Sequence, residues 1–274
     1  MKAESTNQLG RIDEAKRQLV NVLTSELGPF GQLRGEVFSS GVDTLQRGPL
    51  YVMGLNPGGA PGVYKLSILE HVDTWDLTNY SAFTDQCWKS KCWEKDQYGR
   101  QESLRCRCTS CARGKDRQQL AIIDAIKRAF PDEKHPRTVF ASNAIFAASR
   151  SADTFFEDTR NSYTLKQAWE LCWPVHRFLL SIVRPKVVLC LGYDSFSLLT
   201  QSCGRMSSLE THYRSDKQWR YPAFKNCEII LPSESSSVRA LVLGIRHPAR
   251  VPGAIANLPD FEQRIASWLG KNNA

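Results

Sequence analysis

The sequence contains no apolar run that approaches the roughly 20 residues needed to cross a bilayer. Its N-terminal stretch is polar and has no apolar core of the signal-peptide kind, so we expect a cytoplasmic protein with no membrane partner. Internal repeats and low-complexity tracts are also missing, which excludes repeat architectures. The glycine-rich turn at 54–62 lacks the Lys-Ser/Thr ending of a P-loop and is not a GxGxxG fingerprint, which argues against a nucleotide hydrolase.

The composition is that of a globular protein with a basic surface. The 274 residues are 42% hydrophobic and 23% charged, which suffices for a large α/β domain with a substantial core. The formal net charge of +8 favours a polyanionic partner such as nucleic acid; the alternative is a solvated basic surface without a specific partner. Nine cysteines are an odd number, and in a reducing cytosol they do not predict a disulfide framework.

Short apolar strands alternate with amphipathic helices along the chain. We expect strands at 50–55, 138–142, 187–192 and 240–245, and helices at 5–28, 118–130, 164–183, 194–203 and 259–269. This alternation predicts a single α/β domain over residues 1–274, a three-layer α/β/α sandwich with a central four-stranded parallel sheet. The polar, Trp- and Cys-rich segment at about 65–116 has little periodicity, so we expect it to be an insertion that is held together locally.

Three polar residues follow the ends of expected strands: Asn56, Asn143 and His247. Each residue alone is typical of a turn or a cap. The carboxyl ends of parallel strands meet at one edge of a sheet, and ligands bind at that edge. The sequence therefore predicts that these three side chains belong to one site.

The residues around these positions resemble the uracil-DNA glycosylase superfamily. The turn GLNPGGAPG (54–62) is similar to the first motif of its mismatch-specific and single-strand-selective branches, and GIRHPAR (244–250) is similar to its final His-Pro motif. The step Ser142–Asn143 resembles the family's base-recognition step, and VVLCLG (187–192) fits its third strand. The resemblance covers residues 50–64 and 138–269 with gaps, and it implies a uracil-DNA glycosylase-like fold.

The resemblance also implies roles for these residues. The Asn56 side-chain oxygen would orient the attacking water, and His247 would donate a hydrogen bond to the departing base, a contact worth roughly 3–4 kcal/mol. Asn143 would bind the Watson–Crick edge of a base flipped out of DNA. Gly54, Leu55 and Pro57 would line the base pocket. Because no lysine lies within the three motifs to form a Schiff base, we expect a monofunctional enzyme that hydrolyses the N-glycosidic bond, leaves an abasic site and needs no catalytic cofactor.

Further positions are assigned by the same resemblance. An apolar residue four positions after the histidine enters the duplex in the family; here that residue is Val251, and Arg250 is expected to share the task beside Arg246 at the DNA. A plain surface loop is the alternative. The aromatic residue that stacks on the flipped base is left open between Tyr64 and Phe83, and each is also a plausible core or loop aromatic.

Gly58 is the clearest departure from the uracil-specific relatives. Those enzymes place a tyrosine at this position, and its ring rejects pyrimidines with a substituent at carbon 5. A glycine leaves that space open, so the resemblance implies a substrate range that extends from uracil to thymine-like or larger modified bases. Glucosylated hydroxymethylcytosine of phage DNA is one such base, and an antiviral role is the corresponding expectation.

The expected insertion carries five cysteines: Cys87, Cys92, Cys106, Cys108 and Cys111. The C-x-x-C pair at its end, with two further thiolates, predicts a structural zinc site; an iron–sulfur cluster and reduced free thiols are the alternatives. The other four cysteines are expected to be packing residues.

The same insertion is expected to contact DNA. Residues 85–117 contain nine Lys/Arg and five Asp/Glu, interleaved with aromatic residues, a composition typical of surfaces that follow a nucleic-acid backbone. A solvated loop is the alternative. For the whole chain we expect a monomer that binds DNA, and the competing hypothesis is a non-catalytic DNA-binding module that senses modified bases.

Overall fold

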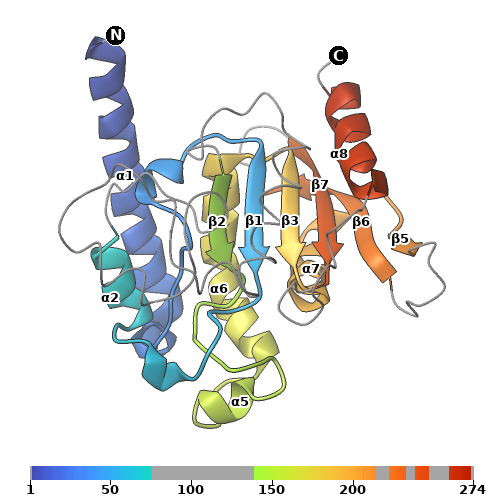
Figure 1. Cartoon of the computed structure of the whole chain (residues 1–274). Coiled ribbons are helices and arrows are strands. Elements are labelled where there is room, and N and C mark those ends of the chain that lie inside the picture. Colours follow the sequence, from blue (N-terminus) through green and yellow to red (C-terminus); the bar gives the residue numbers. More distant parts are fainter. Residues whose placement is uncertain are drawn as a thin grey trace, which may run out of the picture.

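The computed structural model describes residues 2–75, 139–205, 207–213, 222–232, 238–246 and 259–272. Within these ranges, seven strands form one mixed sheet with helices packed on both faces (Figure 1). The strands are β1 Leu50–Gly54, β2 Val139–Asn143, β3 Val187–Leu191, β4 Gly204–Arg205, β5 Glu210–Tyr213, β6 Pro222–Leu231 and β7 Val238–Ile245.

The four expected parallel strands are present and lie in the order β2-β1-β3-β7. Strands β2 and β3 are buried along their whole length, and only the last residue of β1 is partly exposed. Such apolar runs are typical of parallel strands that are covered on both faces. The pairs Gly54–Asn143 and Leu191–Ile245 close the ladders at their carboxyl ends, so all four strands end at one edge.

The sheet is larger than the predicted four strands. Strand β6 pairs with β7 in antiparallel fashion, and β4 and β5 both pair with β6. The sequence PAFKNCEIIL of β6 has polar residues at its centre, Lys225, Asn226 and Glu228, so it lacks the continuous apolar run that marks the parallel strands. Strand β4 is only two residues long, too short to be recognised by its pattern.

The helices agree with the sequence pattern where both can be compared. They are α1 Lys2–Leu27, α2 Ile68–Asp73, α5 Phe155–Asp158, α6 Leu165–Val183, α7 Tyr193–Ser202 and α8 Pro259–Asn272, with short 3-10 turns η1 Gly28–Gln32, η2 Val42–Thr44 and η3 Pro61–Val63. The four long helices begin and end within three residues of the expected bounds, and the helix expected at 118–130 lies outside the described residues. A capping box at Thr164 begins α6, and Pro174 lies inside it. None of the described helices combines the length and apolar character that a membrane span requires.

Alternate residues of the parallel strands supply two cores. Tyr51 and Met53 of β1 face a cluster that includes residues of α1, α6 and α7, whereas Leu50 and Val52 face a cluster completed by Phe261 and two other side chains of α8. This alternation follows from the two-residue period of a strand. Helices therefore cover both faces of the sheet.

The first part of the expected insertion belongs to the core. Ser67 caps α2 through a capping box with Glu70, and Ile68 and Val72 are buried. Trp75 stacks on Phe38 with ring centroids 3.9 Å apart. The first residues of the expected insertion at about 65–116 thus pack into the core as far as Trp75, and the rest of it lies outside the described residues.

Four cysteines lie in the described residues, and all four are buried as thiols rather than disulfides: Cys172, Cys190, Cys203 and Cys227. Burial raises the pKa of three of these thiols, at Cys172, Cys190 and Cys203. The prediction that they are packing residues is confirmed.

A buried chain of hydrogen bonds ties the ends of β1 and β2 to α6. His176 Nε2 lies 2.9 Å from the carbonyl oxygen of Ala144, so this nitrogen carries the ring proton and donates a hydrogen bond to that oxygen. His176 Nδ1 is then an acceptor for the Tyr51 hydroxyl at 3.0 Å, and that hydroxyl lies 2.6 Å from Ser142 Oγ. This chain fixes the backbone on either side of Asn143.

The buried His176 should make stability fall in acid. Burial lowers its pKa from 6.5 to about 4, so between these values the unfolded state binds the proton and the folded state does not. The folded state therefore has its full stability with respect to His176 above pH 6.5, and it loses this contribution as the pH falls towards 4. In urea unfolding at pH 7 and 4.5, we expect the wild type to lose about 2–3 kcal/mol more than His176→Gln, which keeps a donor and an acceptor but does not titrate. Equal losses in the two proteins would contradict this account.

Candidate active site

The site begins where β1 and β2 end side by side. A Cβ atom at Gly54 would lie 2.9 Å from Asn143 Oδ1, so a side chain at this position would displace the Asn143 amide group. The segments that follow the two strands stay paired, because Ala144 N donates to Gly54 O at 2.8 Å and Ile145 N donates to Leu55 O at 2.8 Å. The sequence-predicted residues Gly54, Leu55, Asn56 and Asn143 are therefore brought together.

The Asn56 side chain has a fixed orientation. Its amide nitrogen donates to the carbonyl oxygens of Pro57 at 3.0 Å and Ser149 at 2.9 Å. Two carbonyl acceptors require the nitrogen on that side, which excludes the flipped amide. Among the described residues no donor is bonded to Asn56 Oδ1, and the side chain is only partly buried. This oxygen is available to accept a hydrogen bond from water.

Asn143, at the same edge of the sheet, is buried and is held by hydrogen bonds to the segment 36–37. It is 8% exposed, and its Nδ2 donates to the main-chain oxygen of Glu36 at 3.2 Å. Its backbone N–H donates to Val37 O at 3.1 Å. An amide nitrogen carries two hydrogens, so one donor remains for a ligand together with lone pairs on Oδ1.

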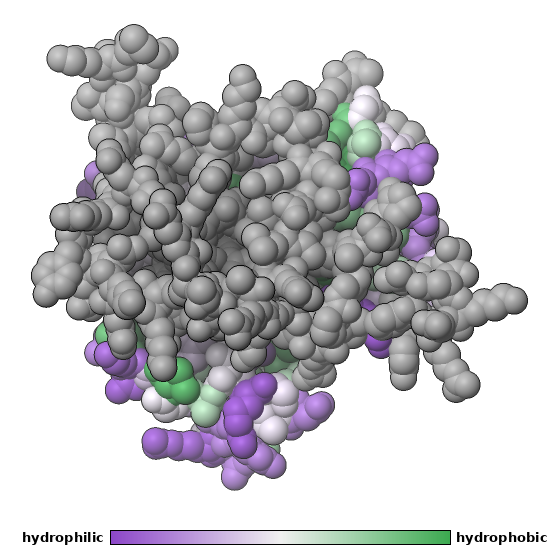
Figure 2. Space-filling view, in the orientation of Figure 1, coloured by the Kyte–Doolittle hydropathy of each residue, from purple (hydrophilic) through white to green (hydrophobic). Residues whose placement is uncertain are grey.

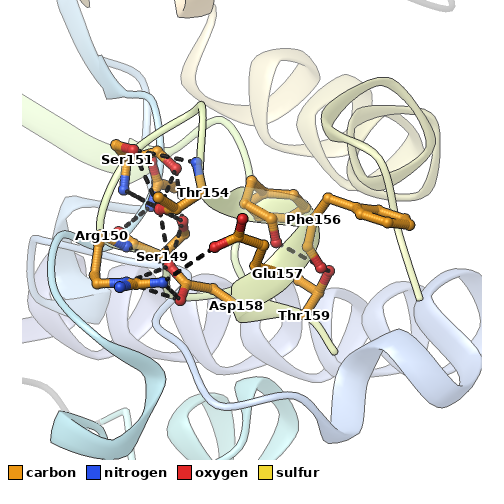
Figure 3. Close-up of polar contacts among 10 residues, drawn as sticks. Ser149, Arg150, Ser151, Thr154, Phe156, Glu157, Asp158 and Thr159 are labelled. Atoms are coloured by element: carbon orange, nitrogen blue, oxygen red, sulfur yellow. Dashed lines mark hydrogen bonds and ion pairs between the residues drawn. The ribbon is translucent and has the colours of Figure 1, made fainter. Parts of the chain in front are cut away.

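The loop after β2 supports Asn56 through a polar network around Asp158 (Figure 3). The Asp158 carboxylate accepts hydrogen bonds from Ser149 Oγ at 3.0 Å, from the backbone N–H of Arg150 at 2.9 Å and from Thr154 Oγ1 at 3.1 Å. The Arg150 guanidinium binds the same carboxylate through two nitrogens, with Nε 2.9 Å and Nη2 2.8 Å from Asp158 Oδ1. These bonds hold the pKa of Asp158 well below its usual range, so the network is ionised at neutral pH. They fix Ser149, whose carbonyl oxygen orients Asn56.

Asp158→Asn should therefore impair turnover without touching the substrate. The replacement puts an N–H group among donors, so the loop and the Ser149 carbonyl shift. For the base release that the resemblance implies, we expect kcat to fall about 10-fold at an unchanged KM, as for a slightly misplaced reacting group. Asp153→Asn is the matched control, because Asp153 is exposed on the same loop. Equal activity of the two variants would exclude a positioning role for Asp158.

The turn after Asn56 leaves open space at the predicted gate. Pro57 is buried and Gly58 is exposed, and a Cβ atom built at Gly58 meets no atom within 4 Å. Gly59 has a φ of 115°, which side-chain-bearing residues rarely adopt. The Tyr64 hydroxyl donates to Gly58 O at 3.0 Å, which sets the Tyr64 ring beside the turn. Tyr64 thus remains the candidate for base stacking within the described residues.

Basic side chains lie farther along the same edge. Arg246 follows β7 and is close enough to Tyr193 to affect the pKa of its phenol, and Lys225 Nζ lies 5.0 Å from the Tyr193 ring centroid. The described surface at α5, beyond the strand ends in Figure 1, is largely hydrophilic with a small hydrophobic area beside it (Figure 2). Arg246 and Lys225 therefore place positive charge suited to phosphates near the strand ends.

Several predicted site residues lie outside the described residues. These are His247, Arg250, Val251, Phe83 and the cysteines Cys87, Cys92, Cys106, Cys108 and Cys111. Strand β7 ends at Ile245, at the same edge as β1 and β2. Among the described residues, no group of three or more His, Cys, Asp or Glu side chains is arranged to hold a metal ion. The zinc site and the roles of these residues remain predictions.

Sequence reasoning missed three contributors to the site. Ser149 and Glu36 hold the two asparagines through main-chain oxygens, and a backbone contact leaves no signal in residue identity. Lys225 lies on β6, which the apolar pattern did not reveal.

The arrangement can hold a water on Asn56 beside a hydrogen-bonding surface on Asn143. Comparison of the chain with protein-family models and with curated proteins finds no match.

Proposed function

We propose that the protein is a monofunctional DNA glycosylase of the uracil-DNA glycosylase type. It would flip a modified or damaged pyrimidine out of DNA and hydrolyse the bond between base and sugar, leaving an abasic site. The observation that carries the proposal is the fixed Asn56 amide, whose oxygen is left as an acceptor on the turn after β1, at the edge where the paired strand β2 ends in the buried Asn143. The parallel strand order and the placement of both asparagines at the carboxyl edge support the same fold type.

The chemistry matches these groups. Glycosidic hydrolysis passes through a sugar with oxocarbenium character and an anionic leaving base, so it needs a held water and donors for the base. Asn56 holds the water by accepting its hydrogen bond, because an amide is too weak a base to remove the proton fully. Asn143 offers an N–H and an oxygen to the Watson–Crick edge, and His247 is the proposed donor to the departing base.

Basic residues at the same edge of the sheet support DNA binding. Arg246 and Lys225 lie near the strand ends, and the formal net charge of +8 favours phosphate contacts. Extrusion of a base costs a few kcal/mol, which contacts in the pocket offset. The basic insertion, with its proposed structural zinc, would add backbone contacts. The open space at Gly58 supports a pocket that admits 5-substituted pyrimidines.

The test is a panel of DNAs incubated with the purified protein. The panel contains uracil, hydroxymethylcytosine and glucosylated hydroxymethylcytosine, each in single- and double-stranded form, together with a duplex that carries a mismatched thymine, and released compounds are identified by mass spectrometry. We expect a free pyrimidine base from at least one DNA, with the phosphate backbone intact. Tight binding to a modified DNA without release of any base would instead establish a non-catalytic binding module.

A further inference from the structure

A glutamate that the sequence analysis did not select lies against the candidate site. The segment 34–38 runs antiparallel to the chain of β2 and beyond, with bridges Phe38–Ser142 and Gly35–Ala147. Within it, the backbone N–H of Glu36 donates to Phe146 O at 2.9 Å, and Glu36 O accepts from Asn143 Nδ2 at 3.2 Å. Glu36 is thus tied at both main-chain ends to the strand that carries the base-recognition residue.

The Glu36 side chain faces two titratable side chains from other elements. His71 of α2 places Nε2 4.0 Å from Glu36 Oε1, too far for a direct hydrogen bond and at the outer limit of an ion pair, which forms only when the imidazole is protonated. Tyr64, which is bonded to Gly58, also senses the charge of Glu36. The nearest basic residue on its own segment, Arg34, is engaged by Glu70 at 3.7 Å and by the carbonyl oxygen of Lys65.

Two features leave His71 and Glu36 open to a ligand: a histidine nitrogen without a hydrogen-bond partner and a partly exposed glutamate side chain. His71 Nδ1 is the one buried side-chain nitrogen or oxygen atom of the described residues without a hydrogen-bond partner. Buried polar atoms are nearly always paired, so an orphan of this kind indicates a missing partner. About 31% of the Glu36 side chain is exposed, which leaves it within reach of a ligand.

Burial sets the protonation of the pair near neutral pH. It raises the pKa of Glu36 to about 7 and lowers the pKa of His71 to about 4. Between these values the two side chains hold one proton and no net charge, and above pH 7 that proton is lost. Among the described residues, no charged group opposes the effect of burial on Glu36.

We propose that Glu36, which lies beside His71 and is bonded through its main-chain oxygen to Asn143, donates a hydrogen bond from its carboxyl group to the Watson–Crick edge of the flipped base, so that Glu36 is a specificity-determining residue. The inference rests on the proposed function. A neutral carboxyl offers one donor and one acceptor, which matches the adjacent donor and acceptor on the edge of a pyrimidine. An ionised carboxylate offers only acceptors and opposes the negative charge that develops on the departing base.

The test is the pH profile of base release in Glu36→Gln. Its amide keeps one donor and one acceptor but cannot titrate. The wild type should lose about 10-fold in kcat/KM between pH 6 and 8 through this group, since a proton with a pKa near 7 is mostly bound at the first pH and mostly lost at the second. The variant should lack this loss. Glu26→Gln, on the exposed face of α1, is the control and should keep the wild-type profile.

A second measurement needs no substrate. The NMR shift of the labelled Glu36 carboxyl carbon should titrate near pH 7 in the free protein, and near pH 4.5 once His71→Ala opens the site to water. Titration of wild-type Glu36 near pH 4.5, or an identical profile in wild type and Glu36→Gln, would overturn the inference. If Glu36 titrates near neutral pH and no DNA yields a free base, the titrating pair stands and the proposed function fails.

Discussion

Asn56→Ala is expected to reduce kcat for base release by about 100-fold or more while DNA binding stays within a few-fold of the wild type. The alanine keeps the turn but removes the oxygen that would hold the attacking water. It also removes the two part-buried hydrogen bonds to the carbonyl oxygens of Pro57 and Ser149, so the fold of the variant is checked by circular dichroism. Single-turnover kinetics on a saturating DNA substrate measures the chemical step directly.

Asn56→Asp separates orientation from acceptor strength. A carboxylate also holds a water, and the sequence alone favours an active variant. In the structure, however, its second oxygen would face two carbonyl oxygens where the amide nitrogen now donates. We therefore expect Asn56→Asp to be less active than the wild type. Normal turnover in Asn56→Ala, with the fold intact by circular dichroism, would exclude the water-positioning role.

Gly58→Tyr is expected to suppress release of a 5-substituted pyrimidine about 100-fold more than release of uracil. Atoms that overlap a packed wall cannot be accommodated without moving it, so a ring in this space acts as a steric gate. The substitution should not damage the turn, since a Cβ atom at Gly58 meets nothing within 4 Å and the residue does not need a positive φ. The measurement is kcat/KM on matched duplexes that differ only at carbon 5.

Gly58→Ala controls for the loss of glycine. Its methyl group is too small to fill the space, so both substrates should react nearly as in the wild type. If Gly58→Tyr lowers the two values of kcat/KM by the same factor, the tyrosine has damaged the turn and the position is no size gate.

The fold could be predicted where sequence and burial have a simple relation. Strands β1 and β3 are runs of apolar residues between turns, and their carboxyl ends are marked by Asn56 and Gly192. Strand β6 was missed because its polar centre carries no such run. The place of α2 was missed because the helix has only six residues, too few for the helical spacing of Ile68 and Val72 to form a recognisable period.

The candidate site could be predicted only in part. The positions of Asn56 and Asn143 follow from parallel pairing, which brings strand ends together. Their orientation could not, because it depends on main-chain oxygens of Ser149 and Glu36, which any residue supplies. The raised pKa of Glu36 comes from its burial in the folded protein, and a single glutamate in the sequence gives no sign of that burial.

The central claim is that Asn56 and its surroundings hydrolyse the bond between a base and its sugar. The most direct measurement compares the free base released with the abasic sites formed, for the wild type and Asn56→Ala on the DNA panel. The account predicts equal amounts of base and abasic sites with the wild type and almost none with the variant, although both bind the DNA. Equal base release by the two proteins, or binding by the wild type with no base released from any DNA, would contradict it.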